Sequence, residues 1–363
     1  MLAVRIAVLL AGAVVVLWTL SSAIQTVVLP RSAASTLTRV HFLALRRVFS
    51  LFASPSRSFA KRDRVMAMYA PLGLVMLPGV WVVLIIAGFT AVFWGTGVDP
   101  LSEAMITSGS SLMTLGFVRA SGSPRVVLEF VEAGIGLGIV SLMISYLPTI
   151  YGAFSRREVL VGMLEVRAGL SSCPAELLTR YTRIGRLDQI RADLFEPWER
   201  WFTEVEESHT SQPALVFFRS PHPERSWITA AGCVLDTAAI VASTVDRRQH
   251  SEADLLLRTG FFSLRRIADF FEIQYDPNPT PTDPISITRR EFDLLCTELI
   301  AVGVPLKTDC DRAWQDFAGW RVNYDEVLIQ LCALVMAPTA KWSSDRMPQQ
   351  RPKPRIRRRR HEE

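Results

Sequence analysis

The residues with the most distinctive chemistry at short spacing lie between positions 99 and 118. Asp99-Pro100 is typical of a helix N-cap followed by a proline at the first helical position, which predicts a helix over 101–113. About 13 residues rise only about 20 Å, which is too short to cross a bilayer. Because hydroxyl groups are poorly placed against lipid, the segment predicts a re-entrant helix that is buried in protein. Its small hydroxyl residues are Ser102, Thr107, Ser108, Ser110 and Ser111.

Three uncharged apolar runs surround this segment and must position it. They cover residues 6–30, 65–98 and 133–155. A bilayer core needs about 20 helical residues, so the runs predict three transmembrane helices. Two readings of the first run stay open, a retained helix and a cleaved signal peptide. We favour the retained helix, because the run is longer than an ordinary signal core.

Composition supports a membrane class. Of the 363 residues, 49% are apolar and 21% are charged, which excludes whole-chain disorder. The net charge of +5 is the remainder of three blocks: +6 over residues 1–155, −6 over 156–350 and +5 over 351–363. The central block is acidic, so the basic pI of about 9.1 does not indicate a nucleic-acid partner.

The charges between the spans predict the orientation. The loop 31–64 holds eight basic residues and one acid, Asp63, and positive loops stay in the cytoplasm. We therefore expect the N-terminus outside, the segment 96–125 outside, and everything after Arg156-Arg157 in the cytoplasm. Within the basic loop the sequence allows two structures, an interfacial helix with snorkelling arginines or a plain charged linker.

Directly after the short hydroxyl-rich helix stands Thr114-Leu115-Gly116-Phe117. A helix, a short pore helix, a Thr-x-Gly-aromatic segment and a second helix over about residues 65–155 together resemble the pore-loop potassium channel superfamily. The alternative is an ordinary extracellular loop. The resemblance implies a bacterial plasma-membrane protein in which four chains conduct potassium passively. It implies a selectivity filter at Thr114, Leu115, Gly116 and Phe117, whose carbonyls face a dehydrated cation, with Phe117 packed behind them.

The third apolar run has a face of small and polar residues at three- and four-residue spacing: Gly134, Gly138, Ser141, Ser145 and Thr149. Such a stripe either lines water or packs closely on another helix. In a pore, Ser141, Ser145 and Thr149 would line the inner vestibule, and Gly138 or Pro148 would be the gating hinge.

Two positions depart from the superfamily pattern. Val118 stands where its last filter glycine sits, and Arg119 stands near the place of a usual acid. Glu103, Glu129 or Glu132 could neutralise Arg119. The departures favour an alternative function, a non-conducting membrane-anchored scaffold or sensor whose helical cytoplasmic domain binds a ligand or partner.

The rest of the chain predicts an all-α protein without enzyme chemistry. Residues 156–342 are expected to form a helical cytoplasmic domain, and 343–363 a disordered basic tail that contacts anionic lipid headgroups. No nucleotide loop, metal-ligand spacing or Cys-x-x-Cys pair occurs, so we expect no cofactor and no metal beyond a permeant K⁺. The predicted cytoplasmic helices are 175–187, 190–208, 228–245, 252–271, 289–301 and 311–336.

Overall fold

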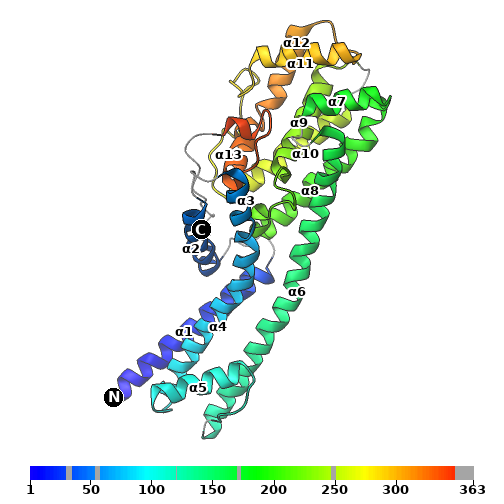
Figure 1. The fold of residues 1–363 in the computed structure, drawn as a ribbon. Coiled ribbons are helices and arrows are strands. Elements are labelled where there is room, and N and C mark those ends of the chain that lie inside the picture. The colour runs from blue at the N-terminus through cyan, green and yellow to red at the C-terminus, as the bar shows by residue number, and fades with distance from the viewer. Residues whose placement is uncertain (30–34, 54–57, 120, 170–172, 247–250, 348–363) are drawn as a thin grey trace. The chain divides into compact units, whose positions relative to one another are not determined.

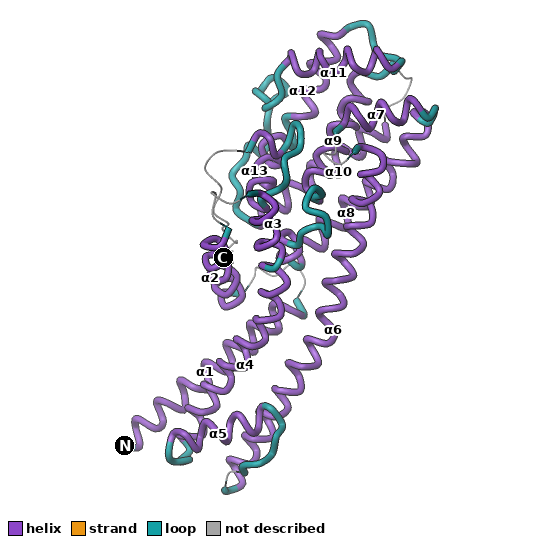
Figure 2. Tube along the Cα trace, viewed as in Figure 1, coloured by secondary structure: helices purple, strands orange, loops and turns teal. Residues whose placement is uncertain are grey.

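The computed structural model describes residues 1–29, 35–53, 58–119, 121–169, 173–246 and 251–347. The fold is all-helical, with 77% of residues in helices and no strand among the described residues (Figures 1 and 2). An isolated antiparallel bridge joins Val245 to Leu306. The chain forms two compact units. The first comprises Met1–Phe52 with Met68–Gly152, and the second comprises Ala53–Ala67 with Ala153–Glu363.

The first unit is built around two apolar helices, α1 (Leu2–Val27) and α4 (Tyr69–Gly95), which lie side by side in Figure 1. Glycines let their backbones approach closely. A Cβ atom on Gly12 would lie 2.5 Å from the Gly88 carbonyl oxygen, and one on Gly88 would lie 2.7 Å from Val16 Cγ2. Small residues at such crossings are typical of helices that pack within membranes. Near the N-terminus, Arg5 Nη2 pairs with Asp99 Oδ2 at 2.6 Å.

The basic loop contains an amphipathic helix, α2 (Thr36–Phe52), so the plain-linker alternative is wrong over these residues. Its apolar face packs on the start of α4. The Tyr69 hydroxyl donates to the Phe42 carbonyl at 3.1 Å, and His41 Nε2 lies 2.9 Å from the Gly73 carbonyl oxygen. The cytoplasmic side of this helix stays a prediction from its charges.

Among the described residues, four helical runs are long and apolar enough to cross a membrane, which is compatible with an integral membrane protein. They are α1, the run Phe59–Gly95 formed by α3 (Phe59–Ala67) and α4, the 46-residue α6 (Ser123–Ala168), and α9 (Trp227–Thr244). The most apolar window of α9 is 94% buried within the protein, against 17% for α1 and α6. The sequence predicted the first three runs and placed α9 in the cytoplasmic core.

The second unit packs amphipathic helices around α9. Those around it are α7 (Pro174–Arg183), α8 (Glu196–Ser211), α10 (Ser251–Phe270), α12 (Cys310–Arg321) and α13 (Asp325–Val335), and α11 (Arg289–Val302) packs on α7. Helix α8 begins directly after a π-helical turn, Arg191–Phe195. The predicted helices agree with these elements, except that the single helix expected over 311–336 is two helices. Their break is stabilised by Asn323, whose Nδ2 donates to the Gly319 carbonyl at 2.9 Å and whose carbonyl accepts from Arg265 Nε at 2.8 Å.

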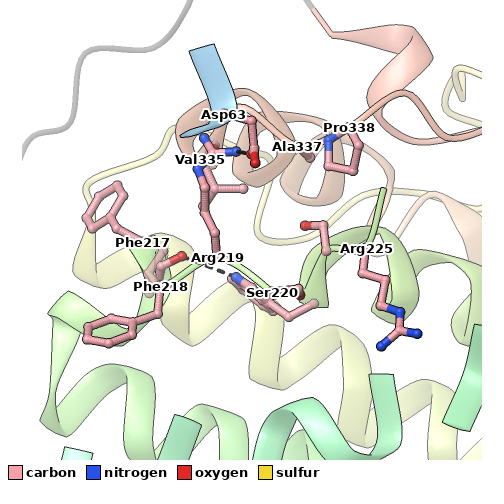
Figure 3. A pocket seen from close by; sticks show the side chains of 12 residues that line it. Asp63, Phe217, Phe218, Arg219, Ser220, Arg225, Val335, Ala337 and Pro338 are labelled. Carbon is pink, nitrogen blue, oxygen red and sulfur yellow. Dashed lines mark hydrogen bonds and ion pairs between the residues drawn. The ribbon is translucent and has the colours of Figure 1, made fainter. Parts of the chain in front are cut away.

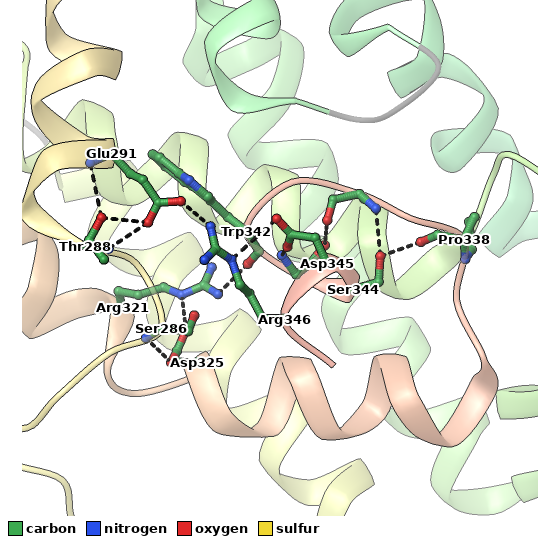
Figure 4. Close-up of polar contacts among 12 residues, drawn as sticks. Ser286, Thr288, Glu291, Arg321, Asp325, Pro338, Trp342, Ser344, Asp345 and Arg346 are labelled. Carbon is green, nitrogen blue, oxygen red and sulfur yellow. Dashed lines mark hydrogen bonds and ion pairs between the residues drawn. The ribbon is translucent and has the colours of Figure 1, made fainter. Parts of the chain in front are cut away.

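A buried ionic cluster holds the end of the second unit together (Figure 4). Arg321 is fully buried; it pairs with Asp236 on α9, and its Nε donates to Asp325 Oδ1 at 2.7 Å. Its Nη2 donates to the Trp342 carbonyl at 2.6 Å. Arg346 pairs with Glu291, so the packed chain extends past the predicted boundary at 342. The remaining tail, 348–363, lies outside the described residues.

Candidate functional site

The hydroxyl-rich segment forms the helix α5 (Leu101–Leu112), which confirms the helix predicted over 101–113. The predicted capping is wrong: Pro100 is the N-cap and makes no side-chain cap hydrogen bond, and the Asp99 carboxylate pairs with Arg5 instead. Figure 1 shows α5 lying across the space between α4 and α6. Its hydroxyl face is turned inward, since Thr107, Ser108 and Ser110 are buried. On α6, Gly136 faces the Leu112 carbonyl so closely that no Cβ would fit. The burial argument is therefore confirmed for these three hydroxyl residues, whereas Ser102 is exposed and Ser111 is half-buried.

Three groups from three helices meet at the middle of α5. Ser108 Oγ lies 2.5 Å from Glu132 Oε1 on α6 and 3.2 Å from the Ile86 carbonyl oxygen on α4. Both Ser108 and Glu132 have no exposed surface, and Glu132 Oε2 has no hydrogen-bond partner among the described residues. Glu132 is thus bonded to the short helix and makes no ion pair with Arg119. The sequence offered this carboxylate as one of three acids that could neutralise Arg119, because nothing local indicates a partner 24 residues away.

The four predicted filter residues begin at the C-terminal end of α5. Thr114 has φ 54° and Gly116 has φ 69°, whereas Leu115 between them is not left-handed. The backbone folds back on the helix end, with the Leu115 N–H donating to the Ser110 carbonyl at 2.8 Å. A β-branched residue in the left-handed region is a genuine outlier, so Thr114 is held there against its own preference.

Leu115 and Phe117 project away from the chain. Their relative exposures are 63% and 66%, which is unusual for large apolar side chains in a polar environment. A Cβ atom on Gly116 would meet nothing within 4 Å, so its glycine is required by backbone conformation rather than by space. Within one chain, no described group packs behind the segment in the way that the resemblance implies for Phe117.

The small-residue face of α6 is also exposed. Ser141, Ser145 and Thr149 each donate a hydroxyl hydrogen to a carbonyl of their own helix, at 2.9, 3.0 and 2.9 Å. Their oxygen lone pairs remain available to water or to another chain. Gly138 and Pro148 lie on the same exposed side. The opposite side of α6 is buried and contains Glu132, Gly136, Ile139, Tyr146 and Ile150.

The C-terminal part of α6 is anchored by a buried arginine in the second unit. Arg157 donates to the Leu215 and Phe218 carbonyls at 2.9 and 2.8 Å and pairs with Glu158 at 2.8 Å. Its Nη1 lies 3.0 Å from His209 Nε2, so His209 accepts and is neutral. Burial, with the nearby Arg157 charge, holds the pKa of His209 well below its usual value.

The short helix α3, which precedes α4 in the chain, is anchored in the same unit by Arg219. This guanidinium pairs with Asp63 and donates to the Val335 carbonyl at 2.6 Å beside a small cavity of about 20 Å³ (Figure 3). Arg219 directly follows Phe218, whose carbonyl binds Arg157. One short segment, 215–219, therefore binds both the helix before α4 and the continuation of α6. Sequence reasoning missed this, because the contacts are far apart in the chain.

No protein-family model, curated protein or solved structure matches the chain. Within the parts of the chain that the structure describes, no cluster of three or more histidine, cysteine or acidic residues could hold a metal ion.

Proposed function

We propose that the protein is an ion-channel-like membrane protein that conducts cations, K⁺ in the first instance, passively through a pore built by four chains. The observation that supports this most strongly is the arrangement of α5 and residues 114–117. A half-buried helix too short to span ends in an exposed segment in which Thr114 and Gly116 are left-handed, between two apolar helices. In a pore-loop filter the backbone carbonyls of such a segment replace the hydration shell of a cation.

The direction of α5 adds to this argument. The C-terminal end of a helix has a partial negative charge, because its last carbonyls lack intrahelical partners. Thr114 and its neighbours follow this end directly. A cation at residues 114–117 is therefore stabilised by the field of the helix as well as by the carbonyls.

One segment per chain cannot surround an ion, so the proposal requires four copies. Several exposed residues would be covered by neighbouring copies of the chain in such an assembly. They are Leu115, Phe117 and the face of α6 with Ser141, Ser145 and Thr149. Farther along α6, Val159, Met163 and Val166 form an exposed apolar stripe at spacings of four and three. This spacing is the pattern of a coiled-coil seam, and an uncharged seam suits symmetric, parallel copies.

We infer three transmembrane helices, α1, α4 and α6, with the re-entrant α5 on the outer side and the second unit in the cytoplasm. Helix α9 is assigned to the cytoplasmic core because its most apolar window is 94% buried and its Asp236 pairs with Arg321. The basic charges of α2 and of Arg156-Arg157 place both on the cytoplasmic side. The basic tail then lies near anionic headgroups of the same membrane face.

The second candidate function is a non-conducting membrane-anchored scaffold or sensor. Val118 and Arg119 favour it, because a β-branched residue resists left-handed geometry and a positive charge at the mouth opposes cation entry. In that case the second unit would bind the ligand or partner.

The two functions are separated by potassium flux in vesicles that contain the purified protein, together with its mass in detergent. We expect four chains of 40.6 kDa and a cation flux. A Gly116→Ala variant places a side chain at φ 69°, which costs about 1–2 kcal/mol and should abolish selective flux. Gly79→Ala, on α4 and equally open, is the matched control and should conduct normally. Unchanged flux and selectivity in Gly116→Ala would exclude the filter assignment.

A further inference from the structure

We propose that Glu132 is a protonated carboxylic acid that positions the short helix α5 by donating a hydrogen bond to Ser108. The proposal rests on the proposed pore function for its consequence, but its chemistry follows from the contacts alone. Glu132 is therefore a positioning residue, which acts on residues 114–117 through α5.

The Glu132 carboxyl has no counter-charge among its described partners. Glu132 is fully buried in a unit of apolar helices, and its described hydrogen-bond partner is a neutral hydroxyl. Its second oxygen, Oε2, is buried and unpartnered among the described residues. Buried carboxylates that lack a cation or several donors take up a proton instead of remaining charged. In a membrane-spanning helix, an ionisable residue of this kind indicates a functional role.

The Ser108 hydroxyl faces two oxygen atoms and has one hydrogen to share with them. Its Oγ lies within hydrogen-bond distance of Glu132 Oε1, at 2.5 Å, and of the Ile86 carbonyl oxygen, at 3.2 Å. A serine hydroxyl has one hydrogen to donate. If Glu132 were ionised, Glu132 Oε1 and the Ile86 carbonyl oxygen would both be acceptors, and the Ser108 hydroxyl could donate to only one of them. If Glu132 is protonated, it donates to Ser108, and Ser108 is free to donate to Ile86.

The resulting chain joins three helices in one direction: α6 donates to α5, and α5 donates to α4. The Ile86 carbonyl also accepts from Thr90 Oγ1 at 2.7 Å, so the chain ends on a carbonyl that already faces hydroxyl donors. Ser110, two residues after Ser108, has a carbonyl and a hydroxyl that accept from Leu115 and Val118. The position of Ser108 is thereby transmitted to the segment with Thr114 and Gly116.

One acid on the short helix is a suitable control. Glu103 lies on α5 itself and is exposed. Replacing Glu103 by glutamine removes a charge from the same helix without touching the chain of hydrogen bonds.

The test uses the full-length protein in vesicles and compares Glu132→Gln, Glu132→Ala, Ser108→Ala and Glu103→Gln. Glutamine donates through its amide, so Glu132→Gln should keep the flux and ion selectivity of the wild type. Glu132→Ala and Ser108→Ala break the chain and should reduce selective flux about tenfold, the effect expected for a lost buried hydrogen bond. Glu103→Gln should behave as the wild type. If Glu132→Gln fails as badly as Glu132→Ala while remaining folded by circular dichroism, the negative charge is needed and the proposal is wrong.

A second measurement is independent of conduction. The infrared difference spectrum between the wild type and Glu132→Gln should contain a carboxylic-acid C=O band that arises from the wild type alone. Absence of this band at neutral pH would overturn the protonated assignment. If no variant and no wild-type sample conducts, the proposed function fails, but the infrared band still decides the state of Glu132.

Discussion

Replacing Arg321 should lower the free energy of unfolding of the second unit far more than replacing any exposed arginine of the same helix. The guanidinium has no exposed surface and binds Asp236, Asp325 and the Trp342 carbonyl. Replacing it by alanine leaves Asp236, which is 1% exposed, with the Tyr324 hydroxyl at 2.9 Å as its remaining hydrogen-bond partner among the described residues. An uncompensated buried charge of this kind costs about 3–5 kcal/mol in free energy of unfolding.

The assay is denaturant and thermal unfolding of the detergent-solubilised full chain, followed by circular dichroism. For a unit of this size, 3–5 kcal/mol corresponds to a fall in Tm of about 10 °C. Arg312→Ala is the matched control on α12, because its pair with Asp316 at 3.3 Å is exposed, and we expect a loss of at most about 0.5 kcal/mol. A double variant, Arg321→Met with Asp236→Asn, should recover part of the loss, since it leaves fewer buried charges unpaired.

Two results would refute this reasoning. One is an Arg321→Ala protein whose free energy of unfolding lies within about 1 kcal/mol of the wild type, at the limit expected for an exposed pair. The other is a double variant, Arg321→Met with Asp236→Asn, whose loss in free energy of unfolding equals the sum of the losses measured for Arg321→Met and Asp236→Asn separately. Residues that share a buried ion pair should be strongly non-additive.

Two further predictions concern the second unit and the assembly. His209 is neutral in the fold and its pKa is held well below its usual value, so the unfolded state binds a proton first as the pH falls. Stability should therefore decrease below about pH 6.5, by up to about 1.4 kcal/mol per pH unit, and His209→Gln should flatten this slope in urea titrations at pH 5 to 7. A slope unchanged in His209→Gln would assign it to other groups. Met163→Glu places a charge in the exposed apolar stripe of α6 and should reduce the proposed tetramer to smaller species in detergent, whereas Ile184→Glu, at another exposed apolar site, should leave it intact. Equal effects of the two variants would argue against the stripe as an interface.

Much of the fold could be predicted from local patterns. The uncharged runs predicted α1, α4 and α6, and the hydroxyl-rich segment predicted α5 within one residue, although its N-cap is Pro100 and not the predicted Asp99. These features are local, because helix length, capping and burial of small polar residues are properties of adjacent positions.

The parts that could not be predicted depend on contacts between distant residues. The break at Asn323 needs Arg265, 58 positions earlier, and an apolar periodicity across 311–336 does not reveal it. The bond between Ser108 and Glu132 joins two helices, and the anchoring of Asp63 by Arg219 spans 156 positions. Single-sequence patterns describe which face of a helix is buried, but not which polar group it meets there.

The central claim, a cation pore with residues 114–117 at its filter, is tested most directly by current recording from the purified protein in a planar bilayer. We predict discrete cation currents that favour K⁺ over Na⁺, retained in Gly79→Ala and lost or made non-selective in Gly116→Ala. Folded protein that passes no current at any tested voltage and pH, and that is monomeric or dimeric in detergent, would contradict the pore and favour the scaffold.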